Sequence, residues 1–329
     1  MPQPVSPERL AQAAFWYYVQ DLGQAEVARR LNTSRSNVSR LLRSAREKGI
    51  IRFEIVHPIQ RDLLLEERLR ARFGQDGVDE FIVAATSGEY FDAPSQETGM
   101  LAVARSAADW LGSKLLDGQT LGLFWGSTVR TVVDVARFEH RIDTHVVQLG
   151  GEWSDEPNRS GHNLVRDLAM KLGGRYTYFN APAFAATAAD AEALLSEPQV
   201  ARSLDAARSA DVCLVGVGAF PEGTTALFIE RAHATTAEIE EAERANVVGQ
   251  LAGRFFDAEG RQADIGLHRR LISLDLTEVR GVTTVAVAAS GIGKAKAVRS
   301  AMRGKMVDVL ICDQALATAL LEVGDGAPT

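Results

Sequence analysis

From about residue 78 to the end of the chain, short apolar runs alternate with longer segments that repeat apolar residues at helical spacing. Such short runs are typical of buried strands, and strands that alternate with helices form a parallel sheet with helices on both faces. The alternation therefore predicts a doubly wound, mainly parallel α/β domain. The expected strands are 80–85, 119–124, 144–149, 211–217, 282–289 and 307–312, and the expected helices are 96–116, 128–138, 160–173, 188–195, 236–253, 294–303 and 314–323.

Length and composition agree with a large folded core and exclude several classes of protein. The chain has 329 residues, of which 46% are hydrophobic, so it suits a small head joined to a large domain. No apolar run approaches the roughly 18 residues that cross a bilayer, and the first residues lack a signal-peptide core. Cys213 and Cys312 stand in apolar runs without metal-ligand spacing. We expect a cytoplasmic protein with reduced cysteines, no metal, no cofactor and no membrane partner.

Charge is distributed unevenly along the chain. The net charge is −7, yet residues 1–61 hold ten Lys and Arg against five Asp and Glu, a net of +5 that leaves −12 for the remainder. A basic head on an acidic body is expected where only one end of a protein contacts the phosphates of nucleic acid. The first 61 residues are therefore the candidate DNA-binding part of the chain.

The basic head is predicted to contain three helices and a short strand. Between the second and third helices, Asn32-Thr33 forms a tight turn, and Ser34 is a good N-cap because its hydroxyl can accept a free backbone N–H. The expected helices are 8–20, 24–31 and 35–48, the expected strand is 50–56, and the third helix is expected to bury Val38, Leu41, Leu42 and Ala45.

This pattern is that of a winged helix-turn-helix, in which the second helix of the motif enters the major groove of DNA. Arginine at the start of that helix can reach guanine and asparagine can reach adenine, whereas residues further along contact phosphate. The candidate DNA-binding residues are Ser34, Arg35, Ser36, Asn37, Ser39, Arg40 and Arg43.

Residues 57–75 are expected to link the head to the body. Pro58 ends the preceding strand because proline cannot donate to a strand ladder, and 59–73 form a charged amphipathic helix. This helix can pair two heads across a dimer or pack on its own body; a dimer is favoured because duplex DNA is usually read by a symmetric pair. The expected domains are 1–56 for DNA binding, 57–75 as the linker helix and 76–324 for effector binding.

Ligands of parallel α/β sheets bind beyond the carboxyl ends of the strands, so the turns that follow strands are the candidate sites. Gly126-Ser127-Thr128 leaves a strand and opens a helix, whose free N–H groups attract an anion, although the same triplet is also an ordinary helix cap. Lys294, at the start of another helix, can hold a phosphate or a hydroxyl as a point charge, or can stand as a solvated surface group.

Two glycine patterns are excluded as nucleotide-binding motifs. After Gly216-Val-Gly218, Pro221 stands where a dinucleotide fingerprint has its last glycine. Around Gly291-Ile-Gly293-Lys294, Ala288 and Ala295 replace the first glycine and the Ser/Thr of a phosphate-binding loop. We therefore expect neither a nicotinamide cofactor nor ATP.

Both parts of the chain resemble the SorC family of sugar-binding transcriptional regulators. The head follows the family pattern of a Tyr-rich helix, Q-x-x-[IV]-A-x-x-L, S-R-x-x-V-S-R-L-L and a strand, through Tyr17-Tyr18, residues 24–31 and residues 34–42. In the body, the likeness is carried by LGLFWGSTV (121–129), VVQLGG (146–151), ADVCLVGVG (210–218), NVVGQLAGRFFDAEG (246–260), ASGIGKAKAV (289–298) and VDVLICDQALATALL (307–321).

The resemblance implies a sensor domain similar to sugar-phosphate isomerases such as glucosamine-6-phosphate isomerase. Family members commonly have an acidic residue where this chain has Gln250; a carboxylate accepts two sugar hydroxyls, whereas an amide both donates and accepts. This departure retains the class of effector and leaves its identity open, and Gln250 has the alternative interpretation of a structural helix residue. The residues that the resemblance places around the effector are Gly126, Ser127, Thr128, Gly151, Gln250 and Lys294.

The expected function is a sequence-specific DNA-binding transcriptional regulator whose operator binding or assembly responds to a sugar, sugar phosphate or polyol. Its expected partners are double-stranded operator DNA, that effector, and further copies of the chain in a dimer or tetramer. One alternative is a sugar-phosphate isomerase-like enzyme that carries a DNA-binding head, and another is an architectural DNA-binding protein without an effector. Catalysis is not expected, because isomerisation needs a general base and the histidines are scattered along the sequence without a carboxylate–histidine constellation.

Overall fold

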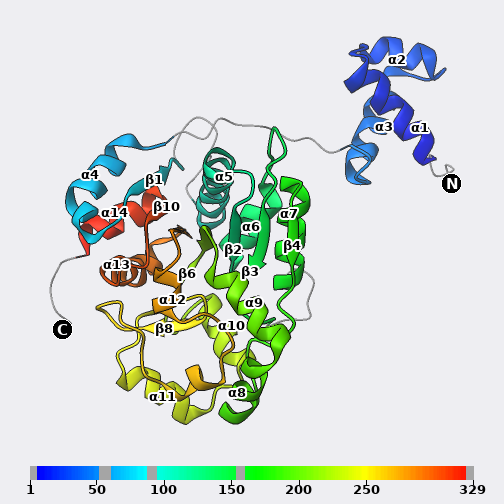
Figure 1. Ribbon diagram of the computed structural model, residues 1–329. Coiled ribbons are helices and arrows are strands. Elements are labelled where there is room, and N and C mark those ends of the chain that lie inside the picture. The colour runs from blue at the N-terminus through cyan, green and yellow to red at the C-terminus, as the bar shows by residue number, and fades with distance from the viewer. Residues whose placement is uncertain (1–5, 52–60, 87–94, 153–159, 324–329) are drawn as a thin grey trace. The chain divides into compact units, whose positions relative to one another are not determined.

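The chain divides into two compact units, Met1–Pro58 and Ile59–Thr329, which are described separately below. The computed structural model describes residues 6–51, 61–86, 95–152 and 160–323 (Figure 1). None of the described helices combines the length and the apolar character that a membrane span requires.

The smaller unit is a three-helix bundle with its own core. Helix α1 (Pro7–Ala14) continues as a π-helical turn, η1 (Phe15–Val19), and is followed by α2 (Gln24–Arg30) and α3 (Arg35–Glu47). The three expected helices are thereby confirmed to within a few residues, and residues 52–56 of the expected strand lie outside the described residues. As predicted, α3 buries Val38, Leu41, Leu42 and Ala45, and they pack against Leu10, Ala13 and Val27.

The larger unit is built on a seven-stranded sheet in the order β1-β10-β9-β5-β2-β3-β4, and every neighbouring pair is parallel. The predicted doubly wound α/β fold is confirmed. The strands are β1 (Glu80–Ala84), β2 (Thr120–Leu123), β3 (His145–Gln148), β4 (Arg175–Thr177), β5 (Val212–Val215), β9 (Thr284–Ala289) and β10 (Val309–Asp313).

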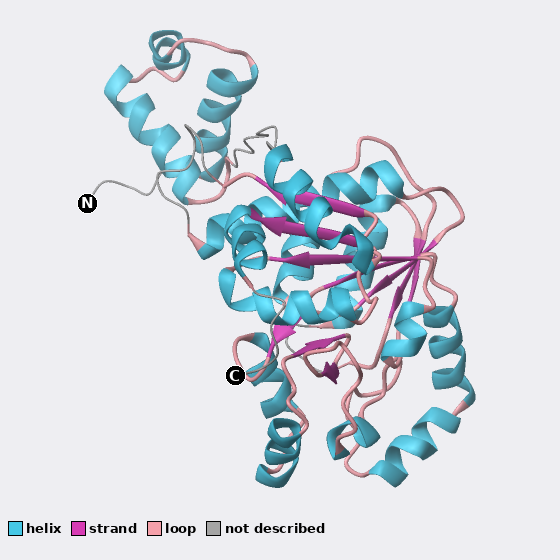
Figure 2. Cartoon of the chain, turned by 90° about the vertical axis from the view of Figure 1, so that its left-hand side faces the viewer, coloured by secondary structure: helices cyan, strands magenta, loops and turns pink. Residues whose placement is uncertain are grey.

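Helices cover both faces of the sheet (Figure 2), and alternate residues of β1, β5, β9 and β10 enter two separate cores, one on each face. On β1, Phe81 and Val83 face the first core, whereas Ile82 and Ala84 face the second. The first core is covered by α4 (Leu63–Phe73), α9 (Pro198–Arg208), α13 (Ala295–Arg303) and α14 (Gln314–Glu322), and the second by α5 (Gln96–Lys114), α6 (Ser127–Val135) and α7 (Gly161–Leu172).

Helix α4 lies in the segment expected to link the two domains, and it packs on the larger unit. Leu65, Leu69 and Phe73 are buried there, so this face of the helix is occupied by its own body. The buried carboxylate of Glu66 accepts two hydrogen bonds of 2.7 Å from the guanidinium of Arg61, which compensates its charge. Of the two roles weighed for this helix, packing on its own body is the one that these residues perform.

A small antiparallel sheet, β6-β7-β8, adjoins the main one and corrects part of the expected pattern. The predicted helix over 236–253 is wrong in its second half, because α11 (Thr236–Arg244) ends before Asn246, which adopts a left-handed φ of 51°. The following residues form strands instead. The elements of this region are β6 (Val217–Ala219), β7 (Gly249–Leu251), β8 (Arg254–Phe256), α8 (Ala188–Ser196), α10 (Thr224–Arg231) and α12 (Leu276–Arg280).

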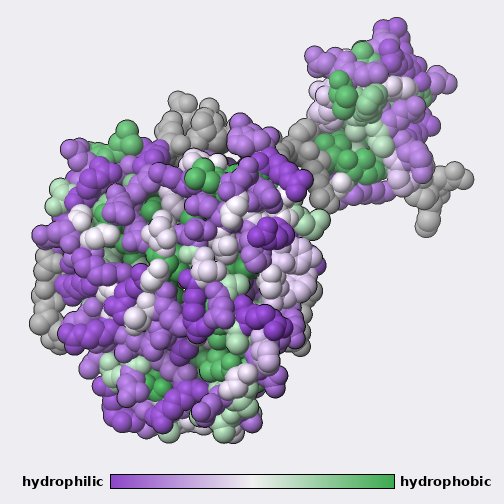
Figure 3. All heavy atoms as spheres, in the orientation of Figure 1, coloured by the Kyte–Doolittle hydropathy of each residue, from purple (hydrophilic) through white to green (hydrophobic). Residues whose placement is uncertain are grey.

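The visible surface of the larger unit is predominantly hydrophilic, with apolar side chains scattered over it (Figure 3). Isolated apolar groups of this kind are normal on protein surfaces. In the smaller unit, the large apolar side chains exposed among the described residues are Phe15, Tyr18, Val19 and Ile50.

The buried imidazole of His268 ties β8 to the segment that follows it. Its Nε2 accepts a 2.9 Å hydrogen bond from the Phe255 N–H, and its Nδ1 donates to the Ala263 carbonyl at 3.0 Å. Burial, assisted by the nearby charge of Arg254, lowers the pKa of His268 from 6.5 to about 3. The folded protein therefore keeps this ring neutral at a pH where the unfolded chain protonates it.

This difference predicts a loss of stability in mild acid. As the pH falls below 6.5 towards about 3, only the unfolded state takes up the proton, so His268 lowers the free energy of unfolding by about 1.4 kcal/mol per pH unit. Urea unfolding between about pH 7 and pH 5 measures the slope. His268→Gln should remove this contribution, whereas the exposed His140→Gln should keep it; equal slopes in the two variants would refute the assignment.

Candidate functional sites

A small pocket lies where the order of the main sheet reverses. The chain passes from β2 through β3 to β4 on one side, whereas β5, β9 and β10 lie on the other. Ligands of open α/β sheets bind at such a reversal, beyond the carboxyl ends of the strands. The pocket is lined by residues that follow β2, β5 and β9, together with α10 and β7: Phe124, Trp125, Gly126, Ser127, Thr128, Gly216, Val217, Gly218, Phe228, Gln250 and Lys294.

The N-terminus of α6 forms one wall of this pocket. Gly126 is its N-cap, and no side chain caps the free N–H groups of the first turn. At the neighbouring helix α7, by contrast, the Glu152 carboxylate accepts hydrogen bonds from the N–H groups of Gly161 and His162 at 3.1 and 2.9 Å. Of these two helix N-termini, that of α6 therefore has no side-chain partner, and anion binding by its Gly126-Ser127-Thr128 turn stays a prediction.

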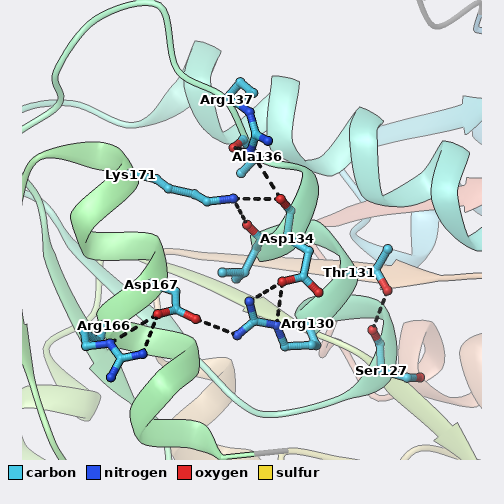
Figure 4. Close-up of polar contacts among 10 residues, drawn as sticks. Ser127, Arg130, Thr131, Asp134, Ala136, Arg137, Arg166, Asp167 and Lys171 are labelled. Carbon is cyan, nitrogen blue, oxygen red and sulfur yellow. Dashed lines mark hydrogen bonds and ion pairs between the residues drawn. The ribbon is translucent and has the colours of Figure 1, made fainter. Parts of the chain in front are cut away.

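Helix α6 is fastened to α7 by charged side chains (Figure 4). Arg130 donates to Asp134 on its own helix at 2.9 Å and to Asp167 on α7 at 3.0 Å. Lys171 of α7 donates to the carbonyls of Val133 and Asp134 at 2.5 and 2.7 Å, which satisfies the carboxyl end of α6. These contacts hold the helix whose first turn lines the pocket.

Lys294 also lines this pocket, from the turn after β9. Among the described residues, its amine has neither a hydrogen-bond nor an ion-pair partner. Burial lowers the pKa of Lys294, and the carboxylate of Asp313 partly opposes that shift. Asp313 is itself occupied, because it accepts from Ser290 Oγ at 2.6 Å and from the N–H of Gly291 at 3.0 Å. The Asp313 carboxylate is thus hydrogen-bonded to Ser290 and Gly291, and ligand binding by the lysine amine stays a prediction.

Gln250 lies on β7 opposite Gly218 of β6, so it is a strand residue and its interpretation as a helix residue is wrong. Its Oε1 accepts a hydrogen bond from the Gly253 N–H at 3.0 Å. A Cβ added to Gly218 would lie 2.7 Å from Gln250 Nε2 and 2.3 Å from Thr225 Oγ1, so glycine is required where these groups converge. Thr225 is fully buried, and its hydroxyl has no hydrogen-bond partner in the described part of the chain.

Sequence reasoning missed Thr225. A signal was present, because Gly223-Thr224-Thr225 opens α10 as Gly126-Ser127-Thr128 opens α6. A buried hydroxyl without a partner destabilises the folded protein unless a ligand completes it.

Thr225→Val should therefore raise the free energy of unfolding of the free protein by about 1 kcal/mol and weaken ligand binding by about tenfold. Thermal unfolding with and without ligand measures both effects. Thr144→Val is the matched control, since Thr144 is also fully buried without a partner, whereas only Thr225 lies directly behind the lining residues Gly218 and Gln250. Thr144→Val should stabilise the folded protein without weakening ligand binding. Equal losses of ligand affinity in the two variants would contradict the role of Thr225.

Gly151 is the one predicted effector residue that does not line the pocket. A Cβ there would lie 2.3 Å from the Pro182 carbonyl oxygen, and the Gly151 N–H donates to the Ile272 carbonyl at 2.8 Å. The structure therefore gives Gly151 a packing role, and a contact with the effector stays a prediction.

The predicted DNA-binding residues lie along α3 and its N-cap. The Ser34 hydroxyl accepts a hydrogen bond from the Asn37 N–H at 3.2 Å, as expected of an N-cap. Asn37 is half-buried and is held from both sides, because its amide donates to Thr33 Oγ1 and accepts from Arg40, each at 2.6 Å. The other members, all exposed, are Ser34, Arg35, Ser36, Ser39, Arg40 and Arg43.

Comparison with known proteins identifies the family. The model of the sugar-binding domain family Sugar-bind matches residues 57–322, which is most of the chain. The chain belongs to the SorC family of sugar-binding transcriptional regulators. As a SorC-family member, it is a transcriptional regulator with a sugar-binding domain.

Named regulators are similar to this SorC-family chain along almost its whole length. The transcriptional regulator LsrR of Escherichia coli is 30% identical over 316 residues, covering 95% of this chain and 94% of LsrR. The deoxyribonucleoside regulator of Bacillus subtilis is 25% identical and covers 94% of this chain and 96% of its own. The crystal structure of the full-length sorbitol operon regulator SorC from Klebsiella pneumoniae shares the fold, with a TM-score of 0.70 at 24% identity over 96% of this chain and 99% of that one.

Proposed function

We propose that this regulator binds operator DNA through α3 and that a sugar, sugar phosphate or polyol in the pocket controls its operator binding or assembly. One observation carries the proposal: effector-binding residues predicted in three distant parts of the sequence line the same pocket. These residues are Gly126, Ser127, Thr128, Gln250 and Lys294.

We propose one role for each of three parts of the chain. Residues 1–56 form the DNA-binding domain, in which Arg40 and Asn37 read bases, Ser34, Arg35, Ser36 and Ser39 flank them, and Arg43 contacts phosphate. Residues 57–75 form the linker, and 76–324 form the effector-binding domain. Self-association into a dimer or tetramer in the cytoplasm would let two heads read a symmetric operator.

The effector binds without being converted. Proton transfer on a sugar requires a general base within hydrogen-bond reach of the substrate. The pocket-lining residues, all of which the structure describes, include neither a histidine nor a carboxylate. Lys294 is the one ionisable side chain of the lining, so a second group to move the proton on oxygen is missing from it. This composition favours a sensor over an isomerase, and turnover of an aldose or ketose phosphate by the purified protein would overturn that part of the proposal.

A thermal-shift screen of sugars, sugar alcohols and their phosphates tests the proposal, since a ligand that binds only the folded state raises the melting temperature. We expect at least one phosphorylated compound to raise the melting temperature of the full-length protein. Lys294→Met should abolish that shift, whereas Lys114→Met, on the exposed end of α5, should retain it. A panel without any response, or a response equal in both variants, would contradict the assigned pocket.

A further inference from the structure

The lining of the pocket is unbalanced in charge and in hydrogen-bonding capacity. Lys294 is its one ionised side chain, and none of the lining residues carries a carboxylate. A pocket that holds a neutral polyol needs acceptors for the hydroxyl protons, whereas a pocket made of donors and a cation suits an anion. The pocket therefore best suits a ligand that presents hydrogen-bond acceptors and negative charge to it.

The donors form two groups separated by one strand. The α6 terminus follows β2 and the Lys294 turn follows β9, and β5 lies between these two strands in the sheet. Adjacent strands lie about 4.8 Å apart, so the two groups are separated by roughly 10 Å. Gly216 and Gly218 follow β5 in that interval, and a Cβ at Gly216 would meet no atom closer than 3.8 Å. An extended ligand can therefore lie over this glycine segment and reach both groups.

The amide of Gln250 determines what the second group accepts. Because its Oε1 already accepts the Gly253 N–H, the Nε2 amide hydrogens are the groups available near Gly218. The Lys294 amine, which lines the same pocket without a hydrogen-bond partner in the described part of the chain, adds a second donor, whereas the buried Thr225 hydroxyl lies behind Gly218 and is not one of the lining groups. A carboxylate at position 250 would instead accept sugar hydroxyls and compensate the lysine charge. The amide at position 250 supplies no such carboxylate.

We infer that the effector is acidic at both ends, a phosphorylated sugar acid whose phosphate lies at the α6 terminus and whose carboxylate lies at Gln250 and Lys294. The inference rests on the proposed function, because it specifies the ligand of the same pocket. It distinguishes this chain from a sensor of sugar phosphates or of polyols, in which the second end of the ligand is neutral.

Three ligands that differ in the oxidation state of the first carbon test the inference: gluconate 6-phosphate and glucitol 6-phosphate, which are open chains, and glucose 6-phosphate, which is mainly a ring. Calorimetric titration of the full-length protein at one pH and salt concentration gives each dissociation constant. We expect the acid to bind at least tenfold more tightly than the other two. Gln250→Glu should reverse the order, weakening the acid at least tenfold and strengthening glucitol 6-phosphate, because the new carboxylate repels one ligand and accepts the hydroxyl of the other.

The outcomes separate the inference from the proposed function. Equal affinities for the three ligands, tighter binding of glucitol 6-phosphate, or an unchanged order in Gln250→Glu would overturn the inference and leave a phosphate-binding sensor in place. Binding of none of the three would overturn the inference and, together with an unresponsive thermal-shift panel, the proposed function as well. Gln262→Glu, outside the pocket, serves as the charge control and should keep the wild-type order.

Discussion

Replacing Arg40 with alanine is expected to weaken operator binding by roughly ten- to a hundredfold while leaving the melting-temperature shift caused by an effector unchanged. Arg40 is exposed on α3 and is held at 2.6 Å by Asn37, so its guanidinium is positioned before DNA arrives. A bidentate contact between arginine and guanine contributes about 1–3 kcal/mol of discrimination. Fluorescence anisotropy with a labelled operator duplex measures the loss.

A matched charge removal in the same unit separates base recognition from general attraction. Arg9 is also exposed, but it lies on α1 and donates to the Leu31 carbonyl at 3.0 Å. Arg9→Ala removes the same charge. It is expected to weaken the binding of operator DNA and of non-specific DNA by a similar, small factor. If Arg40→Ala and Arg9→Ala reduced operator affinity equally, α3 would not be the element that reads the sequence.

Replacing Lys294 with methionine is expected to weaken effector binding at least tenfold and to leave operator binding without effector unchanged. The amine lines the pocket and has no ion-pair partner among the described residues, so a bound anion is its natural counter-ion. Methionine retains most of the volume and removes the charge. Because burial lowers the pKa of Lys294, the wild-type amine loses its charge at a lower pH than an ordinary lysine does.

Effector affinity in the wild type should therefore fall as the pH rises through the lowered pKa of Lys294, and Lys294→Met should lack this dependence. Calorimetric titrations at several pH values, above the range in which the phosphate changes its charge, measure the effect. If the effector affinity of the wild type did not depend on pH and Lys294→Met bound the effector equally well, the anion would not be bound by Lys294.

The sequence was sufficient where local patterns and tertiary structure agree. The buried positions of α3, from Val38 to Ala45, follow helical spacing, and the capping hydroxyl of Ser34 marks where the helix begins. The strands on both sides of β5 are apolar runs, because a sheet covered on both faces leaves no polar side to its central strands. The turns after β2 and β9 were identified because ligands bind beyond the carboxyl ends of parallel strands.

The rest depends on contacts between distant residues. Gln250 and Thr225 come together only because β7 pairs with β6 and α10 packs beside that pair, which no local periodicity encodes. The left-handed Asn246 ends α11, but asparagine also occurs within helices, so the apolar spacing extended the predicted helix too far. Gly151 was assigned to the effector by resemblance, whereas its lack of a side chain is explained by the adjacent Pro182 backbone.

The measurement that tests the account most directly is the affinity of the full-length protein for the DNA upstream of its own gene, with and without an effector found by the thermal-shift screen. We predict specific binding whose dissociation constant changes at least tenfold when the effector saturates the pocket, and no such change in Lys294→Met. A dissociation constant that stays the same at saturating effector, or binding no tighter than to unrelated DNA of the same length, would contradict the coupling of the pocket to the DNA-binding helix.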